Sequence, residues 1–307
     1  MTGVTHLRRV GIASPDPEGL ARFYEQVWGL AISGRREGVI YLRGTGQEHH
    51  VLVISPGPRP SVRLVGLGLA DPAAVDQTAA RLSERPEIRL LSAPRELTEP
   101  GGGYAVRLAD PDGRVLELSA AVAPVEPVDS GAAVRPVKLS HVVLNSARSD
   151  AFSQLLIDAL GFRLADSMPH MRFYRCSADH HSIAITRAPY ASLNHIAFEV
   201  PSCEHVLRGI DNMTALGFET VWGPGRHGPG NNVFGYFAAP NRQVIEYTAE
   251  VEQIPSGEDR PARMWLPEEI SVRDPWAAPD SARPTAHARE LMLGDAEDQD
   301  QRPERPQ

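Results

Sequence analysis

Residues 192–218 read SLNHIAFEVPSCEHVLRGIDNMTALGF and contain the pattern on which the whole chain is built. The apolar run 193–200 predicts a strand, Pro-Ser predicts a turn, and the amphipathic stretch that follows predicts a helix ending at Gly217. The same order recurs with helices at 16–30 (DPEGLARFYEQVWGL), 71–83 (DPAAVDQTAARLS) and 149–162 (SDAFSQLLIDALGF). Short apolar runs follow each helix, so a β-α-β-β-β unit of about 50–60 residues is repeated four times.

The helix ends support this division. Asp16 and Asp71 each precede a proline, which places an N-cap acceptor before the first helical turn. Gly29, Gly161 and Gly217 are each followed by an apolar residue, the pattern of a left-handed C-terminal glycine.

Composition excludes several classes of protein. The chain has 307 residues with 39 Asp+Glu against 31 Lys+Arg, and this net charge of −8 argues against a nucleic-acid partner. Its two cysteines, Cys176 and Cys203, exclude a disulfide scaffold and a cysteine zinc site. No apolar run is long enough to span a membrane, and the N-terminus does not resemble a signal peptide. We therefore expect a cytoplasmic protein without a membrane partner.

The repeat predicts an α+β fold in which four βαβββ units pair into two similar half-barrel domains. The expected boundaries are 1–122 for the first domain, 123–137 for a Pro-rich linker and 138–252 for the second domain. Residues 253–307 form a C-terminal extension rich in Pro, Arg and acidic residues, of which we expect the last 25 or so to be mobile.

Three polar side chains interrupt apolar strands of the second half. His141 lies in KLSHVVLNS, His195 in SLNHIAFEV and Glu246 in QVIEYTAE. If the sheet curls, these residues meet on its inner face. Two imidazoles and one carboxylate form the facial triad of non-haem Fe(II) oxygenases, which leaves metal positions open.

The residues between these positions extend the pattern. The run RCSADHHSIAIT (175–186) contains His181, and GPGRHGPGNNVFGYFAAPNRQVIEY (223–247) contains His227 and Tyr236. With these motifs the chain resembles the extradiol ring-cleaving dioxygenases of the vicinal oxygen chelate superfamily, whose fold is also called glyoxalase-like. The repeat organisation resembles that family in both halves, and the motifs resemble it in residues 138–250.

The resemblance implies a metal site and a reaction. His141, His195 and Glu246 would bind Fe(II), with Mn(II) as a possible substitute, and His181, His227 and Tyr236 would be catalytic. The partners would be a catecholic small molecule and O₂, both of whose atoms are incorporated on cleavage next to the diol. Members of the family usually form homo-oligomers.

Two positions depart from the family pattern. Gly235 stands before Tyr236 where an apolar residue is usual, which would loosen the tyrosine. Arg242 stands where the turn usually has glycine, so it needs a different turn or a left-handed conformation.

The first half lacks the metal ligands. Alignment places Arg9 opposite His141, Val65 opposite His195 and Glu117 opposite Glu246, so we interpret this half as a metal-free scaffold. The pair His49-His50 is expected to lie on a strand of this scaffold.

The substrate pocket is less well specified. Residues 167–177 and Tyr190 are candidates for its wall, with Met168, Met171 and Phe173 as apolar members. Adjacent strand residues face opposite sides, so only one of His180 and His181 faces the metal, and the family motif selects His181.

Two alternatives stay open. One is another metalloenzyme of this superfamily, such as a 4-hydroxyphenylpyruvate dioxygenase-like oxygenase, which would not need the set His181, His227 and Tyr236. The other is a non-catalytic protein that sequesters a ligand, and retention of three metal ligands disfavours it.

Overall fold

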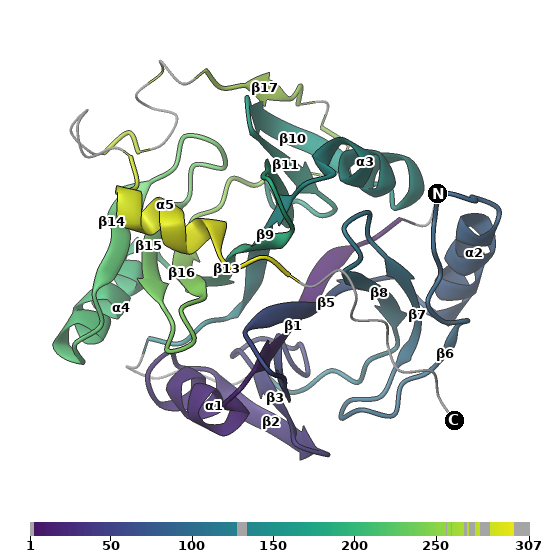
Figure 1. Cartoon of the computed structure of the whole chain (residues 1–307), viewed down its shortest axis with the longest axis horizontal. Helices are drawn as coiled ribbons and strands as arrows, with labels where there is room; N and C mark the ends of the chain where they lie inside the picture. Colours follow the sequence, from purple (N-terminus) through teal and green to yellow (C-terminus); the bar gives the residue numbers. More distant parts are fainter. Residues whose placement is uncertain are drawn as a thin grey trace.

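The computed structural model describes residues 3–127, 134–255, 257–258, 260–266, 269, 274–276 and 283–297. The first half forms an eight-stranded sheet in the order β2-β3-β4-β1-β5-β8-β7-β6 (Figure 1). Its elements are β1 (His6–Ser14), α1 (Pro17–Gln26), β2 (Ala31–Arg36), β3 (Val39–Arg43), β4 (Leu52–Pro56), β5 (Ser61–Gly68), α2 (Pro72–Ser83), β6 (Arg95–Glu96), β7 (Tyr104–Ala109) and β8 (Val115–Ala120).

The second half forms a nine-stranded sheet in the order β14-β15-β16-β13-β9-β12-β11-β10-β17. Its elements are β9 (Lys138–Ser146), α3 (Ser149–Gln154), the π-helical turn η1 (Leu155–Ala159), β10 (Arg163–Met168), β11 (Met171–Arg175), β12 (Ile183–Arg187), β13 (Ser192–Glu199), α4 (Cys203–Ala215), β14 (Thr220–Arg226), β15 (Val233–Ala238) and β16 (Val244–Ala249). The extension adds β17 (Arg263–Met264) and α5 (Ala286–Leu293).

Each sheet joins two βαβββ units at their first strands. β1 pairs antiparallel with β5, and β9 pairs antiparallel with β13. Within every unit the first strand also pairs in parallel with the last strand of the same unit. The predicted α+β class and the four repeated units are therefore confirmed, whereas the exact domain boundaries stay predictions.

The helix ends follow the sequence signals. Asp16 and Asp71 accept hydrogen bonds from the backbone N–H groups three residues on, at 2.8 Å each. Gly29, Gly161 and Gly217 all have positive φ angles, so each helix ends in the left-handed conformation that glycine adopts without strain.

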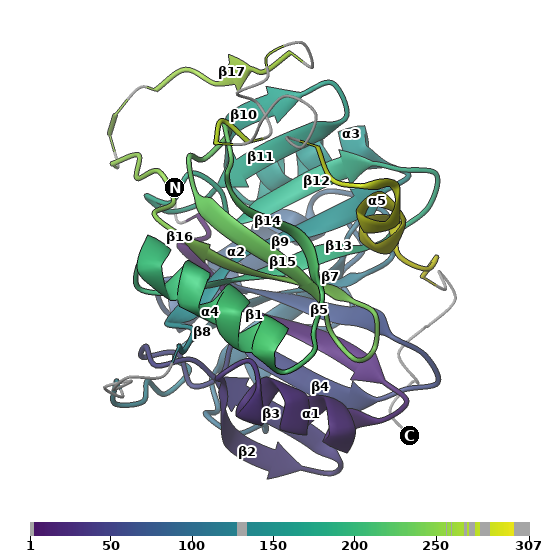
Figure 2. The same ribbon diagram turned by 90° about the vertical axis from the view of Figure 1, so that its left-hand side faces the viewer.

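One continuous apolar core links the two halves. Trp28, just after α1, stacks on Tyr247 of β16 with ring centroids 3.6 Å apart, and both side chains are buried. The Tyr247 hydroxyl donates to the Trp28 carbonyl at 2.9 Å. Figure 2 shows α1 beside α4, which covers β14, β15 and β16 from outside. The first half therefore supports the strands of the second half directly.

The expectation of a mobile C-terminus is wrong for residues 286–293, which form α5. This helix packs on β13 and β14 (Figure 1). Thr285 caps its first turn by accepting from Ala288 N at 3.1 Å, and Leu291 is buried against the second half. Residues 298–307 lie outside the described residues.

None of the helices in the described ranges is long and apolar enough to cross a membrane. Assembly into a homo-oligomer and a cytoplasmic location stay predictions.

Candidate metal centre and pocket

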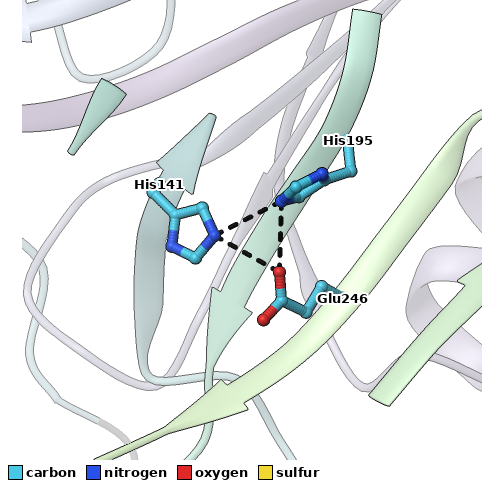
Figure 3. Close-up of side chains that lie close together, drawn as sticks. All are labelled: His141, His195 and Glu246. Atoms are coloured by element: carbon cyan, nitrogen blue, oxygen red, sulfur yellow. Dashed lines mark hydrogen bonds and ion pairs between the residues drawn. The ribbon is translucent and has the colours of Figure 1, made fainter. Parts of the chain in front are cut away.

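Three adjacent strands bring the predicted metal ligands to one face of the second sheet. His141 of β9 and Glu246 of β16 both lie opposite Ala197 of β13 in the strand register. His195 lies two residues before Ala197, so its side chain emerges on the same face. Figure 3 shows all three side chains pointing toward one another.

The distances fit a metal ion. Glu246 Oε2 lies 3.2 Å from His141 Nε2 and 3.2 Å from His195 Nε2, and the two nitrogens are 3.4 Å apart. Ligands about 2.1 Å from a metal at cis or tetrahedral angles are about 3.0–3.4 Å apart. Glu246 is fully buried, and its Oε2 has no hydrogen-bond partner in the described structure. A divalent cation would satisfy this carboxylate oxygen.

Neighbouring side chains orient the ligands. His195 Nδ1 lies 2.8 Å from Asn194 Oδ1, which accepts its proton and leaves Nε2 free to bind a metal. His141 Nδ1 lies 3.1 Å from Ser140 Oγ. Buried Asn232 donates to the other carboxylate oxygen, Glu246 Oε1, at 3.2 Å. These contacts hold all three ligands before a metal binds.

Electrostatics keep two of the ligands in their metal-binding forms. Burial lowers the pKa of His195, so its imidazole is neutral. Burial raises the pKa of Glu246, but the two histidines outweigh this and leave it below its ordinary value. A neutral imidazole and a charged carboxylate are the forms that bind divalent metals.

A cavity of about 270 Å³ opens onto this cluster. The three predicted catalytic residues His181, His227 and Tyr236 all line it, together with both metal-site histidines. His181 lies beside His141, with ring centroids 4.2 Å apart, and Tyr236 lies beside His195, with centroids 5.0 Å apart. The structure thus brings all six predicted site residues together.

Tyr236 and His227 form a pair, in which the phenol oxygen lies 2.9 Å from His227 Nε2. Burial, and then the charge of Glu246, raise the pKa of Tyr236 well above its ordinary value. The phenol therefore keeps its proton and can donate a hydrogen bond. Burial, and then neighbouring His141, lower the pKa of His181 well below its ordinary value.

The cavity wall combines expected and unexpected residues. Met168, Met171 and Phe173 line it as predicted. Tyr190 does not, because its hydroxyl donates to Gly294 O at 3.1 Å beside a different cavity. The residues that sequence reasoning missed are Val143, Thr186, Asn194, Trp222, Pro229, Pro284 and Met292. Pro284 and Met292 belong to the C-terminal extension, whose polar composition does not indicate that it contributes to a pocket.

The two departures from the family pattern have structural explanations. A Cβ atom at residue 235 would lie 2.8 Å from Ile210 of α4, so Gly235 permits close packing of that helix rather than loosening the tyrosine. Arg242 adopts the left-handed conformation with φ of 65°. We expected either a different turn or a left-handed conformation at Arg242, and the structure has the second, which strains the backbone of a residue other than glycine.

His181 lies in the loop before β12, which begins only at Ile183, so His180 and His181 are not the adjacent strand residues that we expected. The pair His49-His50 likewise lies in the loop before β4 and not on a strand. In both pairs the Nδ1 atoms of the two rings face each other, at 3.0 Å in His180-His181 and 3.1 Å in His49-His50.

The first half has a different cluster at the equivalent place. Arg9 and Glu117 both lie opposite Gly66, as His141 and Glu246 lie opposite Ala197. Arg9 Nη2 contacts Glu117 Oε1 at 2.5 Å, and the arginine also pairs with Glu99. A buried guanidinium therefore balances the buried carboxylate of this half.

One predicted equivalence is wrong by one residue. Leu64, and not Val65, corresponds to His195, because Leu64 pairs with Gly11 as His195 pairs with Val143. Val65 faces the apolar core and is fully buried. A shift of one residue in a strand moves a side chain to the other face of the sheet.

Comparison with known proteins agrees with this architecture. Residues 138–247 match the Glyoxalase/Bleomycin resistance protein/Dioxygenase superfamily. Metapyrocatechase 2 of Cupriavidus necator is 33% identical over 132 residues, a segment that spans 42% of this chain and only 41% of that relative. The iron-dependent extradiol dioxygenase of Rhodococcus jostii (strain RHA1) is 25% identical over 276 residues, which cover 81% of this chain and 90% of the relative.

A solved structure matches along nearly the whole length. The crystal structure of the Mn(II)-bound glyoxalase from Novosphingobium aromaticivorans superimposes with a TM-score of 0.84 and 32% identity. The match covers 94% of this chain and 96% of that protein. The predicted glyoxalase-like fold is therefore confirmed over both halves.

Proposed function

Because the chain belongs to the Glyoxalase/Bleomycin resistance protein/Dioxygenase superfamily, we propose that it is an Fe(II)-dependent extradiol dioxygenase. It would cleave a catecholic ring next to the two hydroxyl groups and incorporate both atoms of O₂. The observation that carries this proposal is the triad of His141, His195 and Glu246 beside a cavity lined by acid–base side chains.

The donor set suits this chemistry. A divalent metal on two imidazoles and one carboxylate would lower the pKa of a catechol hydroxyl and keep coordination positions open. The same donors accept Mn(II), since such a ligand set discriminates poorly between the two metals. Both metals occur among similar proteins, of which one is an iron-dependent enzyme and another has Mn(II) bound. We propose Fe(II) as the working ion.

The chain's own residues would orient the diol and move its protons. Tyr236, held by His227, would donate a hydrogen bond to a substrate oxygen on the His195 side. His181, on the His141 side, would exchange a proton with the reacting oxygens. The diol would therefore have a hydrogen-bond donor on one side of the metal site and a proton-transfer group on the other.

The apolar wall indicates the rest of the substrate. Met168 and Met171 of the second half and Met292 of α5 line the cavity with Phe173. Methionine side chains adapt to irregular apolar ligands. We therefore propose a catechol with an apolar substituent on its ring.

Oxygen uptake tests the proposed function. The full-length chain is loaded anaerobically with Fe(II), and separately with Mn(II), and then mixed with catechol, 3-methylcatechol or 2,3-dihydroxybiphenyl in buffer containing ¹⁸O₂. We expect one O₂ consumed per diol and a ring-opened product that carries both labelled atoms. Faster turnover with Mn(II) would correct the metal assignment alone.

Two results would contradict the proposal. A chain that binds metal but consumes no O₂ with any diol would favour other metal chemistry of the superfamily, such as oxidation of an oxo acid. A chain that binds no metal would favour a ligand-sequestering protein.

A further inference from the structure

A buried carboxylate lies behind His181. Asp166 of β10 is fully buried, and its Oδ2 lies 3.0 Å from Nε2 of His180, which is also fully buried. His180 Nδ1 lies 3.0 Å from His181 Nδ1. Asp166, His180 and His181 therefore form a continuous hydrogen-bonded row that ends at the pocket wall.

The charge at the start of this row fixes the direction of its hydrogen bonds. A carboxylate can only accept, so the proton of the first contact lies on His180 Nε2. In this tautomer His180 has a lone pair on Nδ1 and accepts from His181 Nδ1–H. The remaining nitrogen of the His181 ring, Nε2, is left without a proton and can act as a base.

Several donors keep Asp166 ionised. Its carboxylate accepts from Arg260 Nη1 at 2.9 Å, from Arg263 N at 2.9 Å and from Trp265 Nε1 at 2.8 Å. Burial raises the pKa of Asp166, but hydrogen bonds from His180, Arg260 and Trp265 outweigh it and leave the pKa well below its ordinary value. Arg260, Arg263 and Trp265 belong to the extension around β17, which lies next to β10 (Figure 1).

The first half has the histidine pair without the carboxylate. His49 and His50 repeat the Nδ1–Nδ1 contact at 3.1 Å. The position equivalent to Asp166 is Gly34, because Gly34 pairs with Tyr41 as Asp166 pairs with Phe173. The carboxylate is therefore present in the half that has the metal ligands and missing at the equivalent position of the half that has Arg9.

We propose that Asp166 and His180 are positioning residues that hold His181 in a single tautomer, with the proton on Nδ1 and Nε2 free. Their effect on rate rests on the proposed dioxygenase function, but the tautomer itself does not. The arrangement follows the logic of catalytic triads, in which a buried carboxylate selects the tautomer of the imidazole that exchanges protons with the substrate.

Nuclear magnetic resonance of the ring nitrogens tests the proposal. The full-length chain is labelled with ¹⁵N-histidine and loaded with diamagnetic Zn²⁺, and His181→Asn identifies the His181 signals. We expect a protonated Nδ1 and an unprotonated Nε2 in the wild type. In His180→Gln, which removes the acceptor for His181 Nδ1–H, we expect the single tautomer to be lost.

The same variants separate positioning from folding. His180→Gln should lower kcat by about 10- to 100-fold with unchanged metal content, the range for residues that orient a reactive group. His180→Asn places an amide oxygen near the lost Nδ1 and should recover the tautomer and most of the rate. His49→Gln, the matched change in the first half, should leave the His181 signals and kcat unaltered.

A proton on His181 Nε2 in the wild type would overturn the proposal. An unchanged tautomer and unchanged rate in His180→Gln would overturn it too. If no diol is turned over at all, the proposed function fails while the ring-nitrogen signals still decide the tautomer.

Discussion

Arg9 and His141 occupy equivalent positions in the two sheets, but the buried carboxylate beside each of them has different partners. In the first half the guanidinium of Arg9 pairs with fully buried Glu117. In the second half fully buried Glu246 faces two imidazole nitrogens, and its Oε2 has no hydrogen-bond partner in the described structure. A buried carboxylate needs a compensating positive charge. The comparison teaches that the first half contains its own cation, whereas we propose that the second half takes one from solution.

Replacing the buried carboxylate of each half by alanine should give the largest difference between the two halves. Glu246→Ala should weaken metal binding by more than about 100-fold and abolish turnover, since even residues that only support a ligand contribute 10- to 100-fold. Glu117→Ala should leave about one metal ion per chain. Metal content after desalting, measured by elemental analysis, distinguishes the two, and equal loss in both variants would contradict the assignment.

Removing the guanidinium of Arg9 should destabilise the first half without affecting metal binding in the second half. In the described part of the chain, Arg9→Leu leaves partly exposed Arg107 as the remaining ion-pair partner of buried Glu117. Breaking a buried ion pair costs about 3–5 kcal/mol, so the free energy of unfolding should fall by that amount. Urea unfolding measures it. The double variant Arg9→Leu/Glu117→Gln should recover part of the loss, and an Arg9→Leu chain as stable as wild type would refute the interpretation.

The free energy of unfolding should depend on pH in the same way through one buried histidine in each half. Burial, and then Arg9, lower the pKa of His50 to about 2, and burial also lowers the pKa of its counterpart His181. As the pH falls below about 6.5, the unfolded chain binds protons at these histidines while the folded chain does not. The free energy of unfolding of the metal-free chain should therefore decrease with falling pH, by about 1.4 kcal/mol per pH unit for each histidine.

Urea unfolding between pH 6 and pH 4 tests this statement. His50→Asn and His181→Asn should each reduce the slope, and by similar amounts. A slope unchanged from the wild type in both variants would mean that neither histidine is buried in its neutral form.

The smallest expected effect concerns how the first half holds the extension over the pocket. Arg114 Nε donates to Glu297 Oε2 at 2.8 Å, and Asn145 Nδ2 donates to Met292 O at 2.8 Å, which ties α5 to both halves. Glu297→Gln should raise KM by about tenfold with kcat unchanged, because a charged hydrogen bond is worth about 1.5 kcal/mol. Steady-state kinetics measures it, and Glu204→Gln, at an exposed ion pair with Arg208, is the control.

Much of this arrangement could be predicted from the sequence because strong local signals repeat. The caps at Asp16 and Asp71 and the left-handed glycines mark the units, and period-two strands bring His141, His195 and Glu246 to one face. Those features depend on neighbours along the chain, which the sequence displays directly.

What could not be predicted depends on irregular pairing and on distant segments. The exact pairing of β1 with β5 is not visible in the sequence, so sequence alignment predicts Val65 as the counterpart of His195, whereas the structure has Leu64 there. The role of α5 depends on contacts such as Glu297 with Arg114, far apart in the chain. The row from Asp166 to His181 likewise needs β10, the loop before β12 and the extension to be placed together.

Anomalous X-ray diffraction at the iron edge, from crystals of the full-length chain loaded anaerobically with Fe(II), tests the central claim most directly. The account predicts one strong peak among His141 Nε2, His195 Nε2 and Glu246 Oε2, and no peak beside Arg9 and Glu117. A peak in the first half, or no peak among the three ligands, would contradict it.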